Sequence, residues 1–550
     1  AYHRVIGQNG EPVPRASVTV KGSSAGVTAG DNGNFEISAP SNGTLVVSAI
    51  NFSSQEVNIN NRASLEIILV PSNVVMGSEV VVIGYGTQRK KDVTGSTVSV
   101  KGETLNEIKA PNIFNQLQGR AAGVDIQNNS SQIGATGQIR IRGNRSLTNS
   151  ANNPLIVVDG MAYGGSLNDI NPDNIASVDI LKDASATAIF GSRGASGVVI
   201  ITTKRGANQK SVVSVNSYVG VVDVIDTYNL FSGEEYAKFK DDAKAGNSGS
   251  APNTTNYALT PDETANLAAG VNTDWQDLLL TTGMRTSHDL NVRGGNDRTQ
   301  YSFGGGYYRE TGVTRDQVLN RFTFNVNIDH KLSERIKVGF TSFNTLVRSN
   351  RLGTNAYGAA TRLSPLYKPY KDDGSLNFQP AIQQGVDFTQ INPLTSIGND
   401  ELIRAFSRRY QFQHNFYGEV KILKDLKFRS TFGYGWSQTA NNNYEGPNTV
   451  FNTNANTAGS RLSSVNSEGW QYTINNSLEY NTVFAGRHKL QAQVLQEIQK
   501  NYYRNQQFNG TGVPADFIQD YNWQQVFTVN PQGTSNGGAV LDERGLIGYM

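Results

Sequence analysis

The chain contains no cysteine, and only 17% of its 550 residues are charged. Without cysteine it has neither a disulfide framework nor a thiolate metal site. Its net charge of +2 gives no basic footprint of the kind that nucleic-acid-binding proteins show, so we expect no nucleic-acid partner. The sequence also lacks any run of 18 or more apolar residues, which excludes a membrane-spanning helix. Membrane strands remain open, because a strand needs only about 9–11 residues with alternate apolar positions.

Sequence motifs of metallopeptidases and nucleotide-binding enzymes are absent as well. No histidine lies in an HExxH or HxxE arrangement, and there is no GxxxxGK[ST] loop. The glycine-rich stretch 191–197 has the composition of a phosphate cradle, but no lysine follows at the required place, so tight turns explain it better. We therefore predict that the chain is not an enzyme and uses no metal or other cofactor. The histidines are His3, His288, His330, His414 and His488.

The abundant residues favour β structure. Glycine occurs 56 times, and tyrosine and phenylalanine occur 23 times each. Aromatic residues are enriched in strands and glycine in the turns between them. The composition therefore predicts a mainly β fold with many turns.

The segment 139–206 carries the densest set of local signals. Its β-rich runs include Leu155–Val158 and Val198–Thr203, and Asp159-Gly160 is a hairpin-type turn signal. Asn171-Pro172 reads as a helix N-cap followed by proline at the first helical position. A short helix is predicted over 184–190, closed by Gly191 at its C′ position. These signals together predict a compact βαβ-like unit.

The amino-acid sequence of this segment resembles the plug of TonB-dependent outer-membrane transporters. The residues that carry the resemblance are RIRGNRSL…PLIVVDG…ILKDASATAIFGSRGASGVVIITTK. It is most similar to the SusC-like (SusC/RagA) branch, the nutrient importers of Bacteroidetes-type outer membranes. The resemblance implies an outer-membrane location, a TonB-type energy-coupling protein and a SusD-like surface lipoprotein as partners. It also implies an oligosaccharide or oligopeptide as the substrate.

Residues 1–71 form the first predicted domain, a small β-sandwich. Short β-rich runs alternate there with turns rich in Gly, Asn, Asp and Ser. The arrangement GEPVPRASVTVKG…AGDNGNFEIS…GTLVVSAINFSSQEV resembles the carboxypeptidase-regulatory-like extension that precedes SusC-like plugs. The stretch 31–34 is predicted to be a hairpin turn rather than a calcium loop, because the acidic ligands of such a loop are missing.

Residues 72–92 form a linker that contains one β-prone strand with glycines on both sides and no obvious hairpin partner. A strand of this kind suits β-augmentation, in which main-chain hydrogen bonds attach it to a foreign sheet edge. In the family the corresponding segment is the TonB box. The alternative is that the strand completes the preceding sandwich. The candidate TonB-binding residues are Glu79, Val80, Val81, Val82, Ile83 and Gly84.

Residues 93–206 are the predicted plug, a mixed α/β domain. Arg140 and Arg142 alternate with Ile139 and Ile141, so both arginines are expected on one face of a strand, followed by Gly143. Arginines inside a protein need carboxylate or carbonyl partners. We expect Arg140, Arg142 and Gly143 to lock the plug against acidic residues of the barrel wall; direct ligand binding is the alternative.

Residues 207–550 are predicted to be an antiparallel transmembrane β-barrel, because apolar residues recur there at every second position. Short and long connections alternate between the runs: 294–297, 332–334, 423–425 and 485–487 are short, whereas 223–283, 348–407, 438–468 and 500–544 are long. This alternation is typical of outer-membrane barrels, with tight periplasmic turns and long extracellular loops. Helical pieces are predicted in the first long loop, over 233–245 and 261–269. The runs cover 213–221, 288–292, 301–307, 322–328, 336–340, 410–422, 426–436, 470–480 and 490–498, and a tenth begins at Leu546.

Ten strands are fewer than the roughly 22 of plugged outer-membrane transporters. We therefore expect the barrel to be incomplete in this sequence. No signal peptide opens the chain, so a leader is expected to have been removed.

Two other functions remain as alternatives: a siderophore or vitamin receptor of the TonB-dependent class, and a surface adhesin or binding protein built of β modules. The one-sided pattern of long loops and the coupling strand speak against the adhesin. Amides and aromatics in loops and at strand ends suit sugars, but they also suit membrane-interface girdles. The tryptophans are Trp275, Trp436, Trp470 and Trp523.

Overall fold

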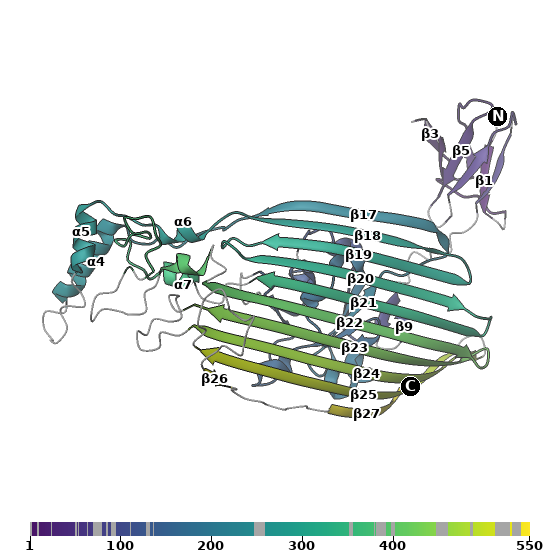
Figure 1. The fold of residues 1–550 in the computed structure, drawn as a ribbon. Coiled ribbons are helices and arrows are strands. Elements are labelled where there is room, and N and C mark those ends of the chain that lie inside the picture. Colours follow the sequence, from purple (N-terminus) through teal and green to yellow (C-terminus); the bar gives the residue numbers. More distant parts are fainter. Residues whose placement is uncertain are drawn as a thin grey trace. The chain divides into compact units, whose positions relative to one another are not determined.

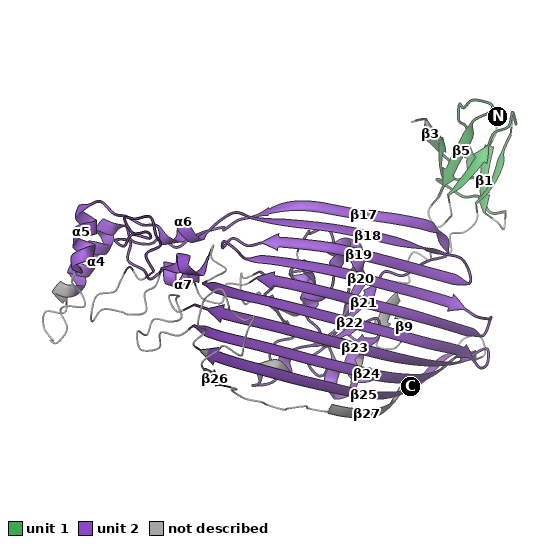
Figure 2. Cartoon of the chain, viewed as in Figure 1, with its two compact units in different colours: residues 1–94 green, residues 95–550 purple. Residues whose placement is uncertain are grey.

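The computed structural model of the chain contains two compact units, Ala1–Thr94 and Gly95–Met550, shown in green and purple in Figure 2. Among the residues it describes, no helix is long and apolar enough to cross a lipid bilayer. The description leaves out residues 1–2, 8–9, 22, 24, 50–51, 53, 63, 70–79, 84–85, 90–94, 111, 128–132, 136, 247–258, 351–355, 379, 381–391, 398–401, 447–459, 485–487, 512–527, 531–540 and 550.

The first unit contains the predicted β-sandwich. One sheet has the order β4-β1-β7 and the other β3-β2-β5-β6. Alternate side chains of both sheets, among them Val5, Val18, Leu45 and Ile67, form one buried core. The strands are β1 (His3–Gly7), β2 (Ser17–Val20), β3 (Gly26–Thr28), β4 (Asn34–Phe35), β5 (Thr44–Ser48), β6 (Gln55–Asn58) and β7 (Glu66–Leu69).

The predicted TonB-binding strand is present as β8 (Val80–Ile83), but it is not alone. It pairs antiparallel with β9 (Gly86–Arg89), with Val81 opposite Gln88. The expectation of a strand without a hairpin partner was therefore wrong. The sequence concealed the partner because backbone groups form the ladder, whereas Thr87, Gln88 and Arg89 show no apolar alternation.

The plug in the second unit is built on a five-stranded mixed sheet of order β10-β15-β16-β13-β14. Helices α1 (Gly102–Leu105), α2 (Ile113–Leu117) and α3 (Ala184–Thr187) and the two-stranded sheet β11–β12 complete it. Its core consists mainly of aliphatic side chains of the plug that are almost fully buried, and Phe343 of the barrel sheet also belongs to it. The strands are β10 (Thr97–Lys101), β11 (Val124–Gln127), β12 (Gln138–Ile141), β13 (Leu155–Val158), β14 (Met161–Ala162), β15 (Ile175–Leu181) and β16 (Val198–Thr203).

The local signals of the plug sequence are confirmed. Asp159 and Gly160 have positive φ angles of 49° and 85°, and they join β13 to β14 in a tight hairpin. The Asn171 side chain caps the 3₁₀ turn η4 (Pro172–Asn174) by accepting from the backbone N–H of Asp173. Asp183 caps α3, and the following turn η5 (Ala188–Gly194) kinks at Gly191, whose φ is 58°.

A large antiparallel sheet lies alongside the plug (Figure 1). Strands β17 to β25 pair each with the next, and β26 (Thr528–Asn530) and β27 (Leu541–Tyr549) both pair with β25. Within the described strands no pairing connects β17 to β26 or β27, so the barrel is partial and not closed. The strands are β17 (Gln209–Val222), β18 (Gly283–Gly295), β19 (Thr299–Thr311), β20 (Val318–Lys331), β21 (Ile336–Asn350), β22 (Ile403–Lys421), β23 (Leu426–Glu445), β24 (Arg461–Phe484) and β25 (His488–Thr511).

The two faces of this sheet differ as the alternation predicts. Phe322 and Phe324 of β20 are exposed on the outer face, whereas Thr323, Asn325 and Asn327 of the same strand are buried on the inner face. The same contrast of apolar outer and polar inner positions recurs in β22 and β24. The inner face is therefore the polar wall against which the plug packs.

Several strands are longer than the predicted runs, and the extra residues lie at the end of the sheet where the long connections begin and end. β23 continues to Glu445 and β24 begins at Arg461, inside the predicted loop 438–468. β25 continues to Thr511, and β26 lies inside the predicted loop 500–544. Beyond the membrane both faces of a strand can be polar, so backbone pairing continues there without the apolar alternation that reveals it in the sequence.

Two long connections form a helical cluster. The predicted helices are present as α4 (Gly233–Gly246) and α5 (Pro261–Ala268), and Thr260 caps α5 in a reciprocal capping box with Glu263. Trp275 in α6 (Trp275–Leu279) is buried against α7 (Ala356–Ala360), and its Nε1–H donates to the Ser364 carbonyl at 2.9 Å.

Candidate functional site between the plug and the barrel wall

The β13–β14 hairpin brings one plug side chain onto the barrel wall. The Asp159 carboxylate holds the turn in place by accepting from the backbone N–H and the hydroxyl of Thr203 at 3.0 and 2.7 Å. Met161, which follows the turn, lies against Gly433 of β23, where any side chain would overlap the Met161 methyl group. The Asn475 amide of β24 contacts the Met161 sulfur at 3.7 Å. Because Gly433 has no side chain, the wall has room there for Met161 of the plug hairpin.

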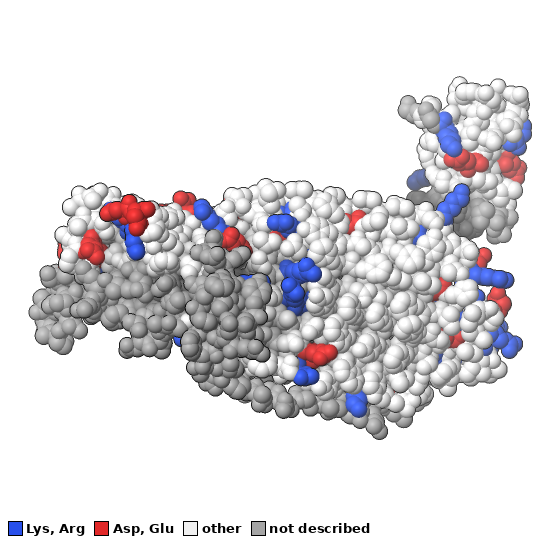
Figure 3. Space-filling view, in the orientation of Figure 1, with Lys and Arg blue, Asp and Glu red and all other residues white. Residues whose placement is uncertain are grey.

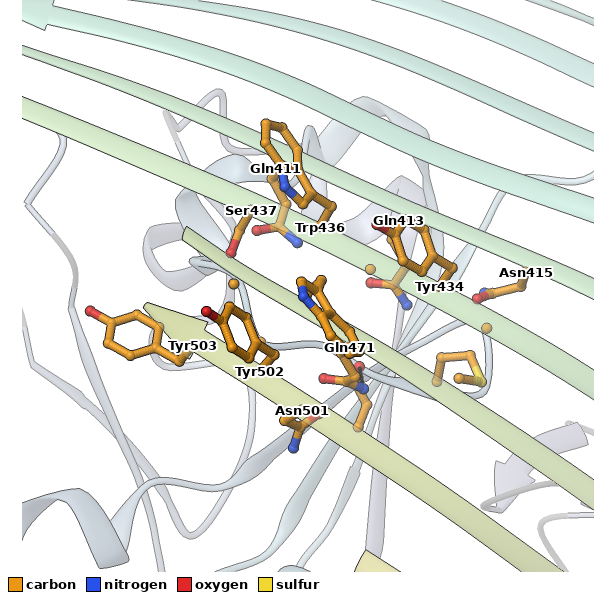
Figure 4. A pocket seen from close by; sticks show the side chains of 17 residues that line it. Gln411, Gln413, Asn415, Tyr434, Trp436, Ser437, Gln471, Asn501, Tyr502 and Tyr503 are labelled. Carbon is orange, nitrogen blue, oxygen red and sulfur yellow. Dashed lines mark hydrogen bonds between the residues drawn. The ribbon is translucent and has the colours of Figure 1, made fainter. Parts of the chain in front are cut away.

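A pocket of about 210 Å³ lies beside this contact, between the hairpin and strands β22 to β25. Gln411, Gln413, Asn415, Gln471 and Asn501 extend around it from three strands (Figure 4). We call this space the wall pocket. Gly433, Gly435 and Gly469 supply bare backbone between these side chains, which leaves room for the cavity.

The wall pocket is neutral and rich in amides. Among the described residues that line it there is no Asp, Glu, Lys, Arg or His. The Asn415 side-chain oxygen is buried and has no hydrogen-bond partner in the described structure. Each Gln or Asn side chain offers two donors and one carbonyl acceptor. Such a surface can bind uncharged hydroxyl or amide groups, and it offers no counter-ion to a charged ligand.

One ion pair between plug and wall joins Asp169 to Arg409. The carboxylate of Asp169 is fully buried in the plug, and both Nε and Nη2 of Arg409 in β22 donate to its Oδ1, the Nε at 3.0 Å. Ser166 and Asp169 form a capping box around η3 (Leu167–Asp169), which fixes the carboxylate from the plug side. The Thr345 hydroxyl of β21 donates to the Asp169 carbonyl at 3.0 Å.

The environment of Asp169 disfavours its charge. Burial raises the pKa of the Asp169 carboxyl above its usual range, and the neighbouring Arg409 guanidinium only partly opposes that shift. Burial and the Asp169 charge also raise the pKa of Tyr163, which lies in the same plug segment. Separating plug and wall would therefore hydrate a carboxylate that is costly to bury, whereas removing Arg409 alone would leave it buried without its partner.

Further polar contacts distribute the interaction over the wall. Arg193 of the plug donates to Glu497 and Gln499 of β25. Asn171, the cap of η4, donates to Asp289 of β18 beside Gly306, where a side chain would overlap both groups. Other wall side chains pair with plug atoms: Arg321 with the Asn168 carbonyl (2.7 Å), Asn327 with the Lys204 carbonyl (3.1 Å), Asn291 with Asn174 (3.2 Å) and Gln471 with the Ala162 carbonyl (3.4 Å).

Arg140, Arg142 and Gly143 occupy different positions from these contacts. Arg140 lies in β12 and donates to Asn153 within the plug at 2.7 Å. Arg142 follows the strand with a positive φ of 57°, so it does not continue the strand alternation, and Gly143 has a φ of 82°. A role for these three residues in locking the plug stays a prediction. The plug–barrel ion pairs described above come from Asp169 and Arg193 instead.

Sequence reasoning can anticipate Asp169 only in part and its partner not at all. The spacing Ser166-x-x-Asp169 resembles a capping box, so the turn itself is predictable, but the arginine that pairs with it lies 240 residues away. Arg193 and Glu497 are 304 residues apart. A single sequence does not distinguish one arginine from another. Only the register of the folded strands identifies the arginines that face the plug.

Two of the tryptophans, Trp436 and Trp470, are among the residues that line the wall pocket. Trp436 and Trp470 are directly opposite each other in β23 and β24, at positions that alternate with the inner-facing Gly435 and Gln471. Trp470 stacks on Tyr502, and Trp436 stacks on Phe412, with ring centroids 5.4 Å apart in both pairs. This arrangement favours an interface girdle. Trp275 is buried in the helical cluster, and Trp523 lies outside the described residues.

Of the candidate TonB-binding residues, the structure describes the backbone of Val80, Val81, Val82 and Ile83, and Glu79 and Gly84 lie outside the described residues. A strand in a two-stranded hairpin has one edge that β9 does not occupy. Backbone hydrogen-bonding groups at such an edge are the requirement of β-augmentation.

An amphipathic sheet with a polar inner wall, lying alongside a plug whose core is mainly its own, has the architecture of plugged β-barrel receptors. Family models agree: residues 89–198 match the TonB-dependent Receptor Plug Domain, and residues 4–82 match the CarboxypepD_reg-like domain. The chain thus contains the plug domain of TonB-dependent receptors, and its sequence relatives are TonB-dependent receptors that include SusC.

One relative is TonB-dependent receptor P26 of Formosa agariphila, with 31% identity over 88% of this chain and 48% of that protein. TonB-dependent receptor SusC of Bacteroides thetaiotaomicron is 34% identical over 69% of this chain and 37% of its own length. Among solved structures, the RagAB peptide importer in its 'open-open' state has the same fold, with a TM-score of 0.67, 23% identity and coverage of 86% of this chain and 53% of that one. The chain spans about half the length or less of the relatives that it matches.

Proposed function

We propose that this chain is part of an outer-membrane transporter that imports a nutrient under the control of a TonB-type protein. Its parts are the extension 1–71, the coupling linker 72–92, the plug 93–206 and the first part of the barrel from 207 onward. A SusD-like surface lipoprotein is the proposed partner at the extracellular loops. Transport, rather than an enzymatic reaction, is the activity.

The observation that carries the proposal is a plug whose hydrophobic core takes one described residue, Phe343, from the wall, and which otherwise meets the wall largely through polar groups. Polar contacts can exchange for contacts with water when a plug moves, whereas a hydrophobic core shared over many residues would resist such motion. Mechanical force is the suitable trigger, because the periplasm and outer membrane hold no nucleotide. The proposed path of force runs through Val80–Ile83 to the plug.

The neutral wall pocket supports an oligosaccharide or oligopeptide as the substrate. Sugar hydroxyls and peptide groups are uncharged and pair well with amides such as Gln413 and Gln471. An iron–siderophore or another charged ligand would gain no ion pair there. The structure of the RagAB peptide importer has a similar fold, and this supports a peptide as one of the two classes.

The decisive test deletes residues 79–84 from the intact receptor and measures substrate uptake beside substrate binding at the cell surface. We expect uptake to be lost and binding to persist, because the chain keeps its loops and wall pocket but loses its coupling strand. The matched control is Val81→Thr, which keeps both a β-branched side chain and the backbone N–H group. Uptake that survives the deletion would contradict energy coupling through this strand, whereas surface binding without uptake in the parent would favour a surface-binding protein or adhesin.

A pair of proline variants refines the test. Neighbouring residues of an antiparallel strand direct their backbone groups to opposite edges, so Val81→Pro and Val82→Pro remove N–H groups from different edges of β8. We expect the variant that alters the unoccupied edge to lose uptake more strongly than the variant that alters the β9 edge. Cross-linking to the TonB-type protein measures the coupling directly.

A further inference from the structure

Three arginines form a row across the outer face of the barrel sheet. Strand register aligns Arg309 of β19 with Asn320 of β20, Asn320 with Arg348 of β21, and Arg348 with Arg408 of β22. All three arginines are exposed, and they alternate with inner-facing residues of their strands, such as the buried Glu310. We call these three residues the arginine row. Figure 3 shows basic side chains gathered on the outer face toward the end that carries α4 and α5.

The arginine row has no counter-ion within the described part of the chain. None of its three guanidinium groups has an ion-pair or hydrogen-bond partner there, although Arg408 lies 5.5 Å from the ring centroid of Phe406. Arg348 and Arg408 are directly opposite each other, an arrangement of like charges that weakens a sheet. In strands β18 to β23, which the structure describes in full, no Asp or Glu occupies an outer-facing position. By contrast, the outer-facing Glu468 of β24 is opposite Arg504 of β25.

An apolar band continues directly from the arginine row. This band lies two residues, or about 7 Å, from the arginine row along each strand. There the strand register aligns Tyr307, Phe322, Leu346 and Tyr410. The rings of Tyr307 and Phe322 are 5.0 Å apart, and the Tyr307 hydroxyl donates to Asn320 within the row at 3.1 Å. Aromatic residues of this kind mark the boundary between hydrocarbon and headgroups. The arginine row therefore lies at headgroup level, at the end of the long connections.

We infer that the arginine row binds the phosphate group of a lipid in the outer leaflet, whose acyl chains lie on the aromatic band below. The inference rests on the outer-membrane location in the proposed function. Arginine presents several N–H donors in a planar fork that matches phosphate oxygens, and two or three such forks can share one phosphate. The bound anion would also offset the repulsion between Arg348 and Arg408.

Lipid is favoured over free phosphate and over an acidic protein by the position of the row. Its three residues lie on the face that carries exposed Phe322, Phe324 and Phe416, which is the face in contact with membrane. A free anion would gain nothing from the aromatic band. A protein partner would have to compete with lipid for that band, whereas a lipid phosphate reaches the arginines with its chains already in place.

The test uses native mass spectrometry of the intact receptor in detergent micelles. Three probes are titrated separately: phosphorylated lipid A, dephosphorylated lipid A with the same acyl chains, and inorganic phosphate. We expect the receptor to retain the phosphorylated lipid and the R309Q/R348Q/R408Q variant to bind it roughly a hundredfold more weakly, since each basic residue near a membrane surface contributes about fivefold. The matched control is Arg335→Gln, which removes an exposed arginine from the short turn at the opposite end and should bind like the parent.

Thermal unfolding in detergent without lipid separates binding from folding. The triple glutamine variant should unfold at the same temperature as the parent or above it, because like charges have been removed. The R348K/R408K variant, which keeps the charges but loses the planar forks, should bind phosphorylated lipid with intermediate affinity.

Three results would overturn the inference: equal binding by the triple variant, equal binding of the dephosphorylated lipid, or full displacement of the lipid by inorganic phosphate at the same concentration. A row that captured an acidic peptide and no lipid would also overturn it. None of these measurements depends on uptake, so failure of the transport proposal would be seen separately in the 79–84 deletion.

Discussion

At the residue scale, Asp169 contributes to holding the plug against the barrel wall. Its carboxylate is buried, its pKa is raised by that burial, and Arg409 is the cation that pairs with it from the wall. The two partners are not equivalent. Asp169 is fully buried, whereas the Arg409 side chain is 24% exposed. Loss of the arginine leaves a dry, unpaired anion, whereas loss of the anion leaves a cation that water can reach.

We predict that Arg409→Gln loosens the plug more than Asp169→Asn does. Leaving a buried charge without its partner costs about 3–5 kcal/mol, and asparagine at 169 keeps an oxygen for the turn. The measurement is the rate of proteolysis of plug residues in the intact receptor, with the unfolding temperature recorded in parallel. Equal effects of the two substitutions would show that the pair acts only by packing.

The Arg409→Gln variant should also respond to pH in a defined direction. Burial raises the folded-state pKa of Asp169, and removing Arg409 takes away the attraction that opposes this shift. A carboxyl with a raised folded pKa gives less stability as the pH rises through that pKa, and more as the pH falls. Acidification should therefore tighten the plug of this variant relative to the parent. A plug that loosens equally in both proteins on acidification would contradict this assignment.

At the scale of elements, two glycines of one strand have different tasks. Gly433 is covered by Met161 of the plug hairpin, whereas Gly435 faces the wall pocket. A methyl group added at Gly435 would lie 3.8 Å or more from its nearest neighbours. Because both glycines have the same phase in β23, they form a matched pair that separates plug seating from passage through the pocket.

We predict that Gly433→Leu displaces the hairpin and that Gly435→Leu does not. Forcing a side chain into the Met161 contact costs about 1–3 kcal/mol and should expose the plug to protease. Leucine at 435 should leave the plug protected but fill the wall pocket, which lowers uptake of the substrate. Unchanged uptake in Gly435→Leu, measured at equal surface expression, would remove the wall pocket from the proposed transport path.

The strand elements also show how far the sequence can be read. Alternation located β17 to β25 because membrane contact imposes a period of two on each strand. It missed the extensions of β23, β24 and β25, where water on both sides removes that constraint. It missed β9 for the same reason, since a polar strand pairs through its backbone alone.

At the scale of the whole molecule, the division of the chain after Thr94 predicts that the first unit folds independently. The first unit has two sheets around its own buried core, so it needs no other part of the chain to bury its apolar side chains. We predict that residues 1–94 alone fold cooperatively, as measured by circular dichroism during thermal unfolding. Leu45→Ala, at a fully buried core position, should lower the free energy of unfolding by about 2–5 kcal/mol. A matched change at the exposed Ile68 should have little effect.

A non-cooperative melt of residues 1–94 would contradict that independence. Insensitivity to Leu45→Ala would instead show that the core is loosely packed.

The amino-acid sequence alone determines the features that depend on residues close together in the chain. These are the strand alternation, the Asp159-Gly160 turn, the caps at Asn171 and Asp183, and the succession of sandwich, linker, plug and barrel strands. Which polar residues meet is set by the folded sheet and plug. Asp169 with Arg409, Met161 with Gly433, and the alignment of Arg309, Arg348 and Arg408 all depend on strand register over long separations. The physical reason is range: turns and amphipathic strands are encoded within a few residues, whereas a contact between distant side chains exists only after the sheet has formed around the plug.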